Sequence, residues 1–251
     1  MDLTGNRYSA LFTRCLSAVS YTVGTDYANE FAFFYTRKAS MPEQDRCDLT
    51  RKPKVIAESL TGSRLPDPLF PVQPCIAPDT LRQCYGIGKE EVMAMIVPGA
   101  GWQAKQWQAE KFQRIAAYLE DHGLRVLISG SSAERPLLQQ VGSSLNRGII
   151  LTDSLEHSIA FLPHLKIFIG NDSGLTQMAA ATGIHVLTFF CSTNPSFLKF
   201  SNNVITLCSN CVHSPDCKSQ YCHTPPRQIC AESAFMNIEA EQVENVLKEI
   251  L

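Results

Sequence analysis

The chain has 251 residues, enough for one large or two modest domains, and 45% of them are hydrophobic, enough for a sizeable core. Its net charge of −2 argues against a nucleic-acid-binding protein, which usually carries a basic balance or patch. No apolar run is long enough to span a membrane. Arg14 also interrupts the apolar stretch 10–19, so we expect no signal peptide and a cytoplasmic protein.

Residues 1–90 carry the weaker structural signals. Their apolar pattern predicts a helix over 8–20, a short strand over 21–23 and a helix over 48–60. Residues 63–80 contain five prolines, which predict an extended linker. We therefore expect two domains, residues 1–80 and 81–251.

From residue 92 onward, short apolar segments alternate with amphipathic ones. The predicted strands span residues 92–97, 124–128, 149–151, 167–169, 186–190 and 204–207. The predicted helices span residues 108–121, 133–145, 155–164, 174–182 and 238–251. This alternation predicts an α/β fold with a parallel sheet covered on both faces, in which ligands bind beyond the carboxyl ends of the strands.

The turn after the first of these strands, residues 98–101, leads to Lys105. Gly99, Gly101 and Ala104 match a dinucleotide-binding fingerprint, which would suggest an NAD-dependent reductase. That fingerprint requires an acidic residue at the end of the second strand, and none occurs before Glu134. Lys105 is either a solvated residue of the first helical turn or, because a lysine at a helix N-terminus opposes the helix dipole, a sign of an anionic partner.

The second turn, residues 170–174, joins a buried strand to a helix rich in alanine. Backbone N–H groups and the positive end of the helix dipole make such a junction an anion site. Asp172 cannot bind phosphate itself, but it can cap the helix or accept hydrogen bonds from a sugar hydroxyl or an amine. Gly183 lies where a C-terminal cap glycine is expected. A capped helix with no ligand is the plainer interpretation.

The two turns together resemble glycosyltransferase family 9, the heptosyltransferases of lipopolysaccharide core assembly. The resemblance rests on Asn171-Asp172-Ser173-Gly174 before a helix of small residues, and on Pro98-Gly99-Ala100 before Lys105 and Trp107. It implies a nucleotide-sugar site formed by Pro98, Gly99, Ala100, Lys105, Glu134, Asp172, Ser173, Gly174 and Gln177. The family usually has a histidine where this chain has Gln177.

Lys105 is the catalytic residue that the resemblance implies. Transfer from a nucleoside-diphosphate sugar expels a diphosphate, and a compact cation stabilises the charge that develops on it. We therefore expect Lys105 and the turn at 172–174 to converge on a single diphosphate. Glu134 would contact the nucleoside part of the donor, or it would only satisfy N–H groups at a helix start.

Members of this family have a GT-B fold, with an N-terminal acceptor domain facing a C-terminal donor domain. The resemblance therefore implies a GT-B-like protein with a complete Rossmann-like donor domain and a partial, N-terminally truncated acceptor domain. The family's general base, an aspartate of the acceptor domain, has no counterpart here, and Asp2 is not assigned that role because no strand precedes it.

The implied activity is transfer of a sugar from an ADP-heptose-like donor to a lipopolysaccharide core or other saccharide acceptor. The alternative is a catalytically incomplete nucleotide-sugar-binding remnant, or one half of a split enzyme. No cofactor and no nucleic acid are expected. The acceptor implies peripheral contact with the cytoplasmic face of the inner membrane.

Five of the ten cysteines lie within residues 208–230, together with His213 and His223. Many family members carry a similar cysteine-rich loop. The spacing allows a structural zinc site, a disulfide or reduced thiols, and we favour a structural role without metal because the spacing is irregular.

Overall fold

The structure is a computed structural model. It describes residues 22–26, 33, 35–41, 51–65, 74–101, 105–152, 154–190, 203–208 and 237–251. The chain divides into two compact units, Met1–Leu69 and Phe70–Leu251. This division falls within the predicted linker 63–80, and the predicted domain limit at residue 80 stays a prediction. In the described part of the chain, no helix combines the length and apolar character needed to cross a membrane.

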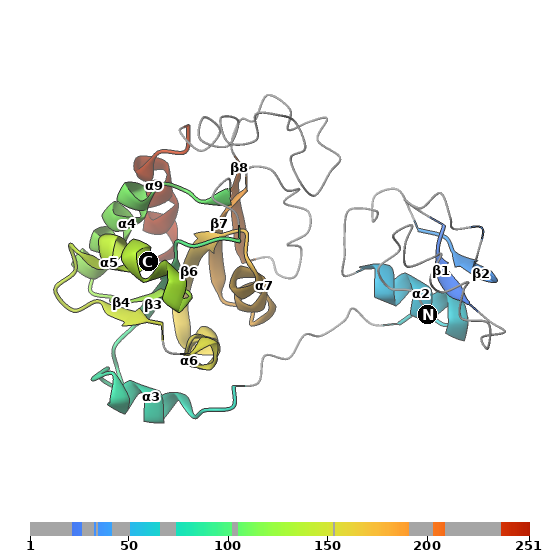
Figure 1. Cartoon of the computed structure of the whole chain (residues 1–251), viewed down its shortest axis with the longest axis horizontal. Coiled ribbons are helices and arrows are strands. Elements are labelled where there is room, and N and C mark those ends of the chain that lie inside the picture. The colour runs from blue at the N-terminus through green and yellow to red at the C-terminus, as the bar shows by residue number, and fades with distance from the viewer. Residues whose placement is uncertain are drawn as a thin grey trace. The chain divides into compact units, whose positions relative to one another are not determined.

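The first unit contains two short parallel strands and a helix (Figure 1): β1 (Val23–Thr25), β2 (Arg37–Ala39) and α2 (Arg51–Thr61). Val23, Ala39 and Ile56 form its small buried core. Of the strand predicted over 21–23, Val23 lies in β1, Thr22 precedes it and exchanges hydrogen bonds with Thr36, and residue 21 lies outside the described residues. The helix predicted over 8–20 lies outside the described residues.

The second unit is built on a six-stranded parallel sheet, as the alternating pattern predicted. Its strands are β3 (Met93–Val97), β4 (Arg125–Ser129), β5 (Ile149–Leu151), β6 (Leu165–Asn171), β7 (His185–Phe190) and β8 (Val204–Cys208). Their spatial order is β5-β4-β3-β6-β7-β8. If β3 is counted as the first strand, this is the doubly wound order 3-2-1-4-5-6, in which the winding reverses between β3 and β6.

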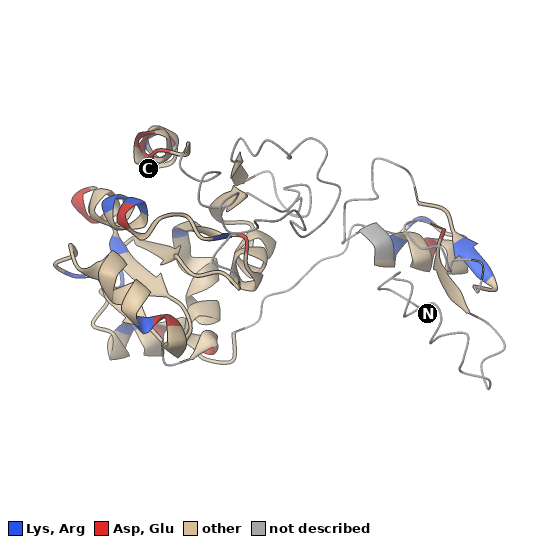
Figure 2. Cartoon of the chain, turned by 45° about the horizontal axis from the view of Figure 1, so that its top comes forward, with Lys and Arg blue, Asp and Glu red and all other residues tan. Residues whose placement is uncertain are grey.

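Helices cover both faces of this sheet (Figure 1). One core packs the sheet against α4 (Ala109–Asp121), α5 (Arg135–Gly142) and α9 (Ala240–Ile250). The other core packs it against α3 (Pro78–Cys84), α6 (Leu155–Phe161) and α7 (Gly174–Ala181). The inner strands β3 and β7 are buried almost throughout and contain no Lys, Arg, Asp or Glu, as expected for strands covered on both faces. The strands of this sheet are drawn mostly tan in Figure 2, which marks charged residues in blue and red.

Three predicted boundaries are wrong in detail. The predicted linker does not stay extended to residue 80, because α3 begins at Pro78, a position where the missing N–H of proline costs nothing. The helix predicted over 133–145 is a short 3-10 turn, Ser132–Glu134, followed by α5. The helix predicted over 155–164 is α6 followed by a 3-10 turn, Leu162–His164.

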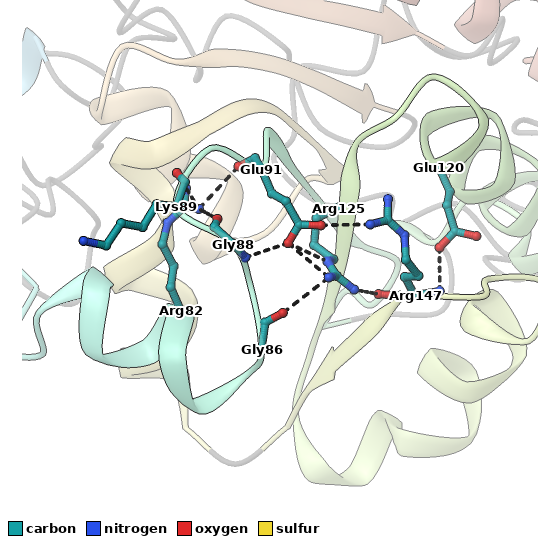
Figure 3. Close-up of polar contacts among 8 residues, drawn as sticks. All are labelled: Arg82, Gly86, Gly88, Lys89, Glu91, Glu120, Arg125 and Arg147. Atoms are coloured by element: carbon teal, nitrogen blue, oxygen red, sulfur yellow. Dashed lines mark hydrogen bonds and ion pairs between the residues drawn. The ribbon is translucent and has the colours of Figure 1, made fainter.

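A charged network joins the amino ends of β3 and β4 (Figure 3). The Glu91 carboxylate accepts a hydrogen bond from the Gly88 N–H at 2.7 Å and pairs with Arg125 at 3.0 Å and Arg147 at 2.9 Å. Burial alone would raise the pKa of Glu91, but these contacts outweigh it and hold the pKa below its ordinary value. The network therefore links the amino ends of the strands, at the end of the sheet opposite the carboxyl ends.

Candidate functional site

The carboxyl ends of β3 and β6 meet at the point where the winding of the sheet reverses. Val97, the last residue of β3, pairs with Gly170 in β6. A Cβ at position 170 would lie only 3.0 Å from the Val97 carbonyl oxygen, so glycine allows the two strand ends to approach closely. Doubly wound sheets bind their ligands at this switch point, beyond the carboxyl ends of the strands.

Lys105 and Asp172 come together at this switch point, from the two loops that leave the neighbouring strands. The Lys105 Nζ lies 2.7 Å from the Asp172 Oδ2, and the two side chains are 15% and 14% exposed. The expected convergence of Lys105 with the 172–174 turn is therefore present in the structure. The contact places a cation and a carboxylate at a partly desolvated position. There, the interaction of each charge with a bound ligand is stronger than it would be at the open surface.

The amino end of α7 follows Asp172 directly. Ser173 is its N-cap, and its side chain accepts a hydrogen bond from the Thr176 N–H at 3.3 Å. A Cβ at Gly174 would meet no atom within 4 Å, so the space beside this first turn is open. Gln177, partly buried, lies on the same turn. The helix ends as predicted, with Gly183 in the left-handed conformation at φ 79°.

Glu134 lies against the turn formed by Pro98, Gly99 and Ala100. Its Oε2 accepts hydrogen bonds from the Ser131 N–H at 2.8 Å and the Ser131 hydroxyl at 2.7 Å, which completes a capping box. Its carboxylate also fills the space that a Cβ at Gly99 would need. The structure therefore brings Glu134 to the same strand end as the first turn, while its capping role is present as well.

Asn171 is a site residue that the sequence did not identify beyond its place in the motif. Its side chain is fully buried at the end of β6. It accepts a hydrogen bond from the Trp107 N–H at 3.0 Å and donates one to the Pro98 carbonyl at 2.7 Å. The sequence could have indicated this role, because Asn171 ends an apolar strand. A buried amide needs hydrogen-bond partners for both its oxygen and its nitrogen.

Trp107 anchors the segment that carries Lys105. Its ring stacks on Phe189 with centroids 4.3 Å apart, and its indole N–H donates to the Ile238 carbonyl at 3.0 Å. Lys111 donates to the same carbonyl at 2.8 Å. The Lys105 segment is thus held against β7 and against the start of the C-terminal helix region.

Taken together, the described residues offer one cation, a neighbouring carboxylate, a helix amino end and a second carboxylate at Glu134. This set suits a ligand that combines an anionic group with hydroxyl groups. Residues 102–104 lie outside the described residues, and so does the cysteine-rich segment apart from the exposed Cys208. The expectations about zinc, disulfides or free thiols in that segment stay predictions.

Comparison with known proteins gives consistent matches. The family model "Glycosyltransferase family 9 (heptosyltransferase)" matches residues 1–226. Lipopolysaccharide heptosyltransferase 2 of Escherichia coli K12 is 26% identical over 121 residues, which cover 45% of this chain and 35% of that protein. The matched stretch is thus about a third of the length of this curated relative.

Two solved structures share the fold. A family 9 glycosyltransferase from Veillonella parvula superposes with a TM-score of 0.70 at 16% identity, covering 96% of this chain and 70% of the other. The E. coli heptosyltransferase WaaC with ADP gives a TM-score of 0.69 at 19% identity, covering 100% and 72%. These likenesses confirm the predicted α/β, GT-B-like fold class.

Proposed function

Because this chain belongs to glycosyltransferase family 9, we propose that it binds a nucleoside-diphosphate sugar of the ADP-heptose type at the carboxyl ends of β3 and β6. It would transfer the sugar to a lipopolysaccharide core or another saccharide acceptor. The observation that carries this proposal is the Lys105–Asp172 contact of 2.7 Å at the carboxyl ends of neighbouring parallel strands. It joins the two loops that the family motifs single out.

In the proposed reaction, the bond between the sugar's anomeric carbon and a diphosphate oxygen breaks, and its electron pair leaves with the diphosphate. The acceptor hydroxyl oxygen forms the new bond to carbon and gives its proton to a base. Negative charge therefore grows on the diphosphate during the step. Lys105 is placed to stabilise that charge, which lowers the barrier because the interaction strengthens toward the transition state.

The residues around Lys105 take complementary roles in this proposal. Asp172 orients the ammonium and accepts hydrogen bonds from sugar hydroxyls, since its own charge repels phosphate. Ser173, Gly174 and Gln177 present the amino end of α7 to the diphosphate, which favours an anion by the helix dipole. Gln177 donates a hydrogen bond where the family usually has a histidine.

Glu134 completes the donor site at the nucleoside end. Its carboxylate lies over Gly99 and is oriented by Ser131, so it can accept hydrogen bonds from ribose hydroxyls. Pro98, Gly99 and Ala100 form the backbone beneath it. No cofactor takes part in the proposed reaction. Because a lipopolysaccharide core acceptor is anchored in lipid, transfer would take place at the cytoplasmic face of the inner membrane.

The solved WaaC structure with ADP supports a nucleoside diphosphate as the ligand. The name of the curated relative supports heptose as the sugar. The second candidate is a nucleotide-sugar-binding protein that does not transfer the sugar by itself. This candidate is retained because the match covers only 35% of the length of the curated relative.

Two measurements on the full chain separate these candidates. The first is calorimetric binding of ADP-heptose, and the second is transfer of heptose to a lipid A–Kdo acceptor, followed by mass spectrometry of the product. Binding together with transfer supports the enzyme, and binding without transfer supports the second candidate. Absence of binding would refute both.

Substitutions at Lys105 and Asp172 test whether donor binding or transfer depends on the proposed site. Asp172→Asn keeps the side-chain shape but removes the partner charge of Lys105, so we expect weaker donor binding. Lys166→Ala is the matched control for Lys105→Ala, because Lys166 is exposed near the amino end of β6, the strand that ends beside Asp172. Equal effects of the two lysine substitutions would argue against a local role for Lys105.

A further inference from the structure

The side-chain amide of Asn171 connects the two ends of the loop that carries Lys105. We call residues 98–101 and 105–107, the described residues between β3 and the N-cap of α4, the lysine loop. Pro98 is its first residue and Trp107 its last. The Asn171 Nδ2 donates to the Pro98 carbonyl at 2.7 Å, and the Asn171 Oδ1 accepts from the Trp107 N–H at 3.0 Å. One side chain therefore closes the loop at its base.

These two hydrogen bonds lie entirely in the interior. Asn171 is 0% exposed and Trp107 is 1% exposed, so no bulk water can replace either bond when it is lost. The amide of asparagine matches the task, because it combines a donor and an acceptor on one rigid plane. A carboxylate of the same shape lacks the donor for Pro98, and leucine lacks both groups.

The same stretch of β6 also reaches the cation of the loop. Lys105 lies two residues before Trp107, and its ammonium contacts Asp172, the residue that follows Asn171. Residues 171 and 172 therefore hold the backbone of the lysine loop and its charged end at once. The hydroxyl of Thr176 in turn donates to the Asn171 carbonyl, which joins this stretch to the first turn of α7.

We propose that Asn171 is a positioning residue that sets the location of the Lys105 ammonium relative to the turn at 172–174. This inference rests on the proposed function of that turn as a diphosphate site. Catalytic groups must be held close to their productive position, and a misplacement of about 1 Å can cost on the order of 10²-fold in rate. Asn171 does not touch the ligand in this account and acts only through the lysine loop.

The first test uses Asn171→Asp and Asn171→Leu, with binding of ADP measured by calorimetry at pH 8 and pH 5.5. When ionised, the carboxyl introduced by Asn171→Asp accepts from the Trp107 N–H but sets an oxygen against the Pro98 carbonyl. When protonated, it can donate to that carbonyl and restore both bonds. Burial raises the pKa of such a carboxyl, which brings protonation within the tested range.

We therefore expect Asn171→Asp to bind ADP about tenfold more weakly than wild type at pH 8 and to approach wild type at pH 5.5. Asn171→Leu should bind weakly at both pH values. The wild-type protein measured at each pH corrects for effects of pH on the rest of the protein and on the ligand. A constant ratio of Asn171→Asp to wild type across this range would contradict the proposal.

The second test asks whether Asn171 acts through Lys105. In a Lys105→Ala background, Asn171→Leu should lose most of its effect on the ADP affinity, because the charged group that it positions is gone. A full penalty in that background would overturn the proposed role. Ser158→Ala is the matched control, since it removes a buried hydrogen bond, between Ser158 and Ser129, in which no residue of the lysine loop takes part.

Hydrogen exchange keeps the inference testable if the wild-type chain binds no ADP, a result that would refute the proposed function. Asn171→Leu should speed exchange of the Trp107 amide and of peptides covering residues 98–107, while Ser158→Ala should not. Unchanged exchange at Trp107 in Asn171→Leu would show that Asn171 does not hold the loop, whatever the chain binds.

Discussion

Replacing Gly99 by alanine should weaken ADP binding by displacing the Glu134 carboxylate. A Cβ at position 99 would occupy the place of the Glu134 Oε1 atom, and the Oε2 atom would lie 3.0 Å away. The backbone itself should tolerate alanine, because Gly99 is not among the glycines with positive φ. The methyl group therefore moves the end of a flexible side chain and leaves the fold in place.

The expected magnitude follows from the contacts of Glu134. A hydrogen bond to a charged group contributes about 1.5–3 kcal/mol. Because Glu134 is partly exposed, its hydrogen bond to the ligand should contribute at the lower end of this range, about 1.5 kcal/mol, which corresponds to roughly tenfold in affinity. The bonds between Glu134 and Ser131 lie at an exposed helix start, so the free energy of unfolding should fall by less than about 1 kcal/mol.

A double-mutant cycle with Glu134→Ala, read by calorimetry with ADP, checks this reasoning. Once the carboxylate is absent, alanine at position 99 has room and should cost nothing further, so the coupling energy should equal the penalty of Gly99→Ala alone. Gly101→Ala is the matched control in the same loop, because a Cβ there meets no atom within 4 Å. Penalties that simply add in the double mutant would refute the mechanism.

Three further predictions concern stability and the charge of the site. Glu91→Gln should lower the free energy of unfolding by about 1–2 kcal/mol at pH 7, measured by urea titration, with the exposed Glu90→Gln as the control at that pH. Because the folded pKa of Glu91 is depressed, the difference between Glu91→Gln and wild type should shrink as the pH falls below about 4.5 and through the folded pKa, and a difference that does not change with pH would contradict this. Gln177→His should tighten ADP binding below about pH 6.5, where the imidazole is charged, and an affinity ratio to wild type that does not vary with pH would contradict this. Ser173→Ala and Ser154→Ala each remove an N-cap and should each cost about 1 kcal/mol of stability, but only Ser173→Ala should weaken ADP binding in a paired calorimetric measurement.

Much of the second unit could be predicted from the sequence, because its strands are apolar and its helices amphipathic. The six strand segments were found to within a few residues, and β5 was found with its observed limits. β2 was not predicted, because Arg37 and Lys38 show no strand pattern. α3 was not predicted either, because it begins inside a proline-rich segment. Local propensity does not report such elements when tertiary packing decides them.

The site was only partly predictable for a different reason. The family resemblance implied that Lys105 and the turn at 172–174 converge, but local pattern alone could not show it, because their contact depends on β3 and β6 being neighbours and strand order is not encoded in local pattern. The role of Asn171 depends on two backbone groups far away in the sequence, Pro98 and Trp107. Only the folded sheet brings those groups to one amide.

The most direct test of the central claim compares ADP with adenosine as ligands for wild type, Lys105→Ala and Lys166→Ala. If Lys105 binds the diphosphate, Lys105→Ala should lose about 2–3 kcal/mol of ADP binding, roughly 30- to 160-fold, and should leave adenosine binding unchanged. Lys166→Ala should bind both ligands as wild type does. An equal loss for ADP and adenosine in Lys105→Ala, or no loss for either, would contradict the account.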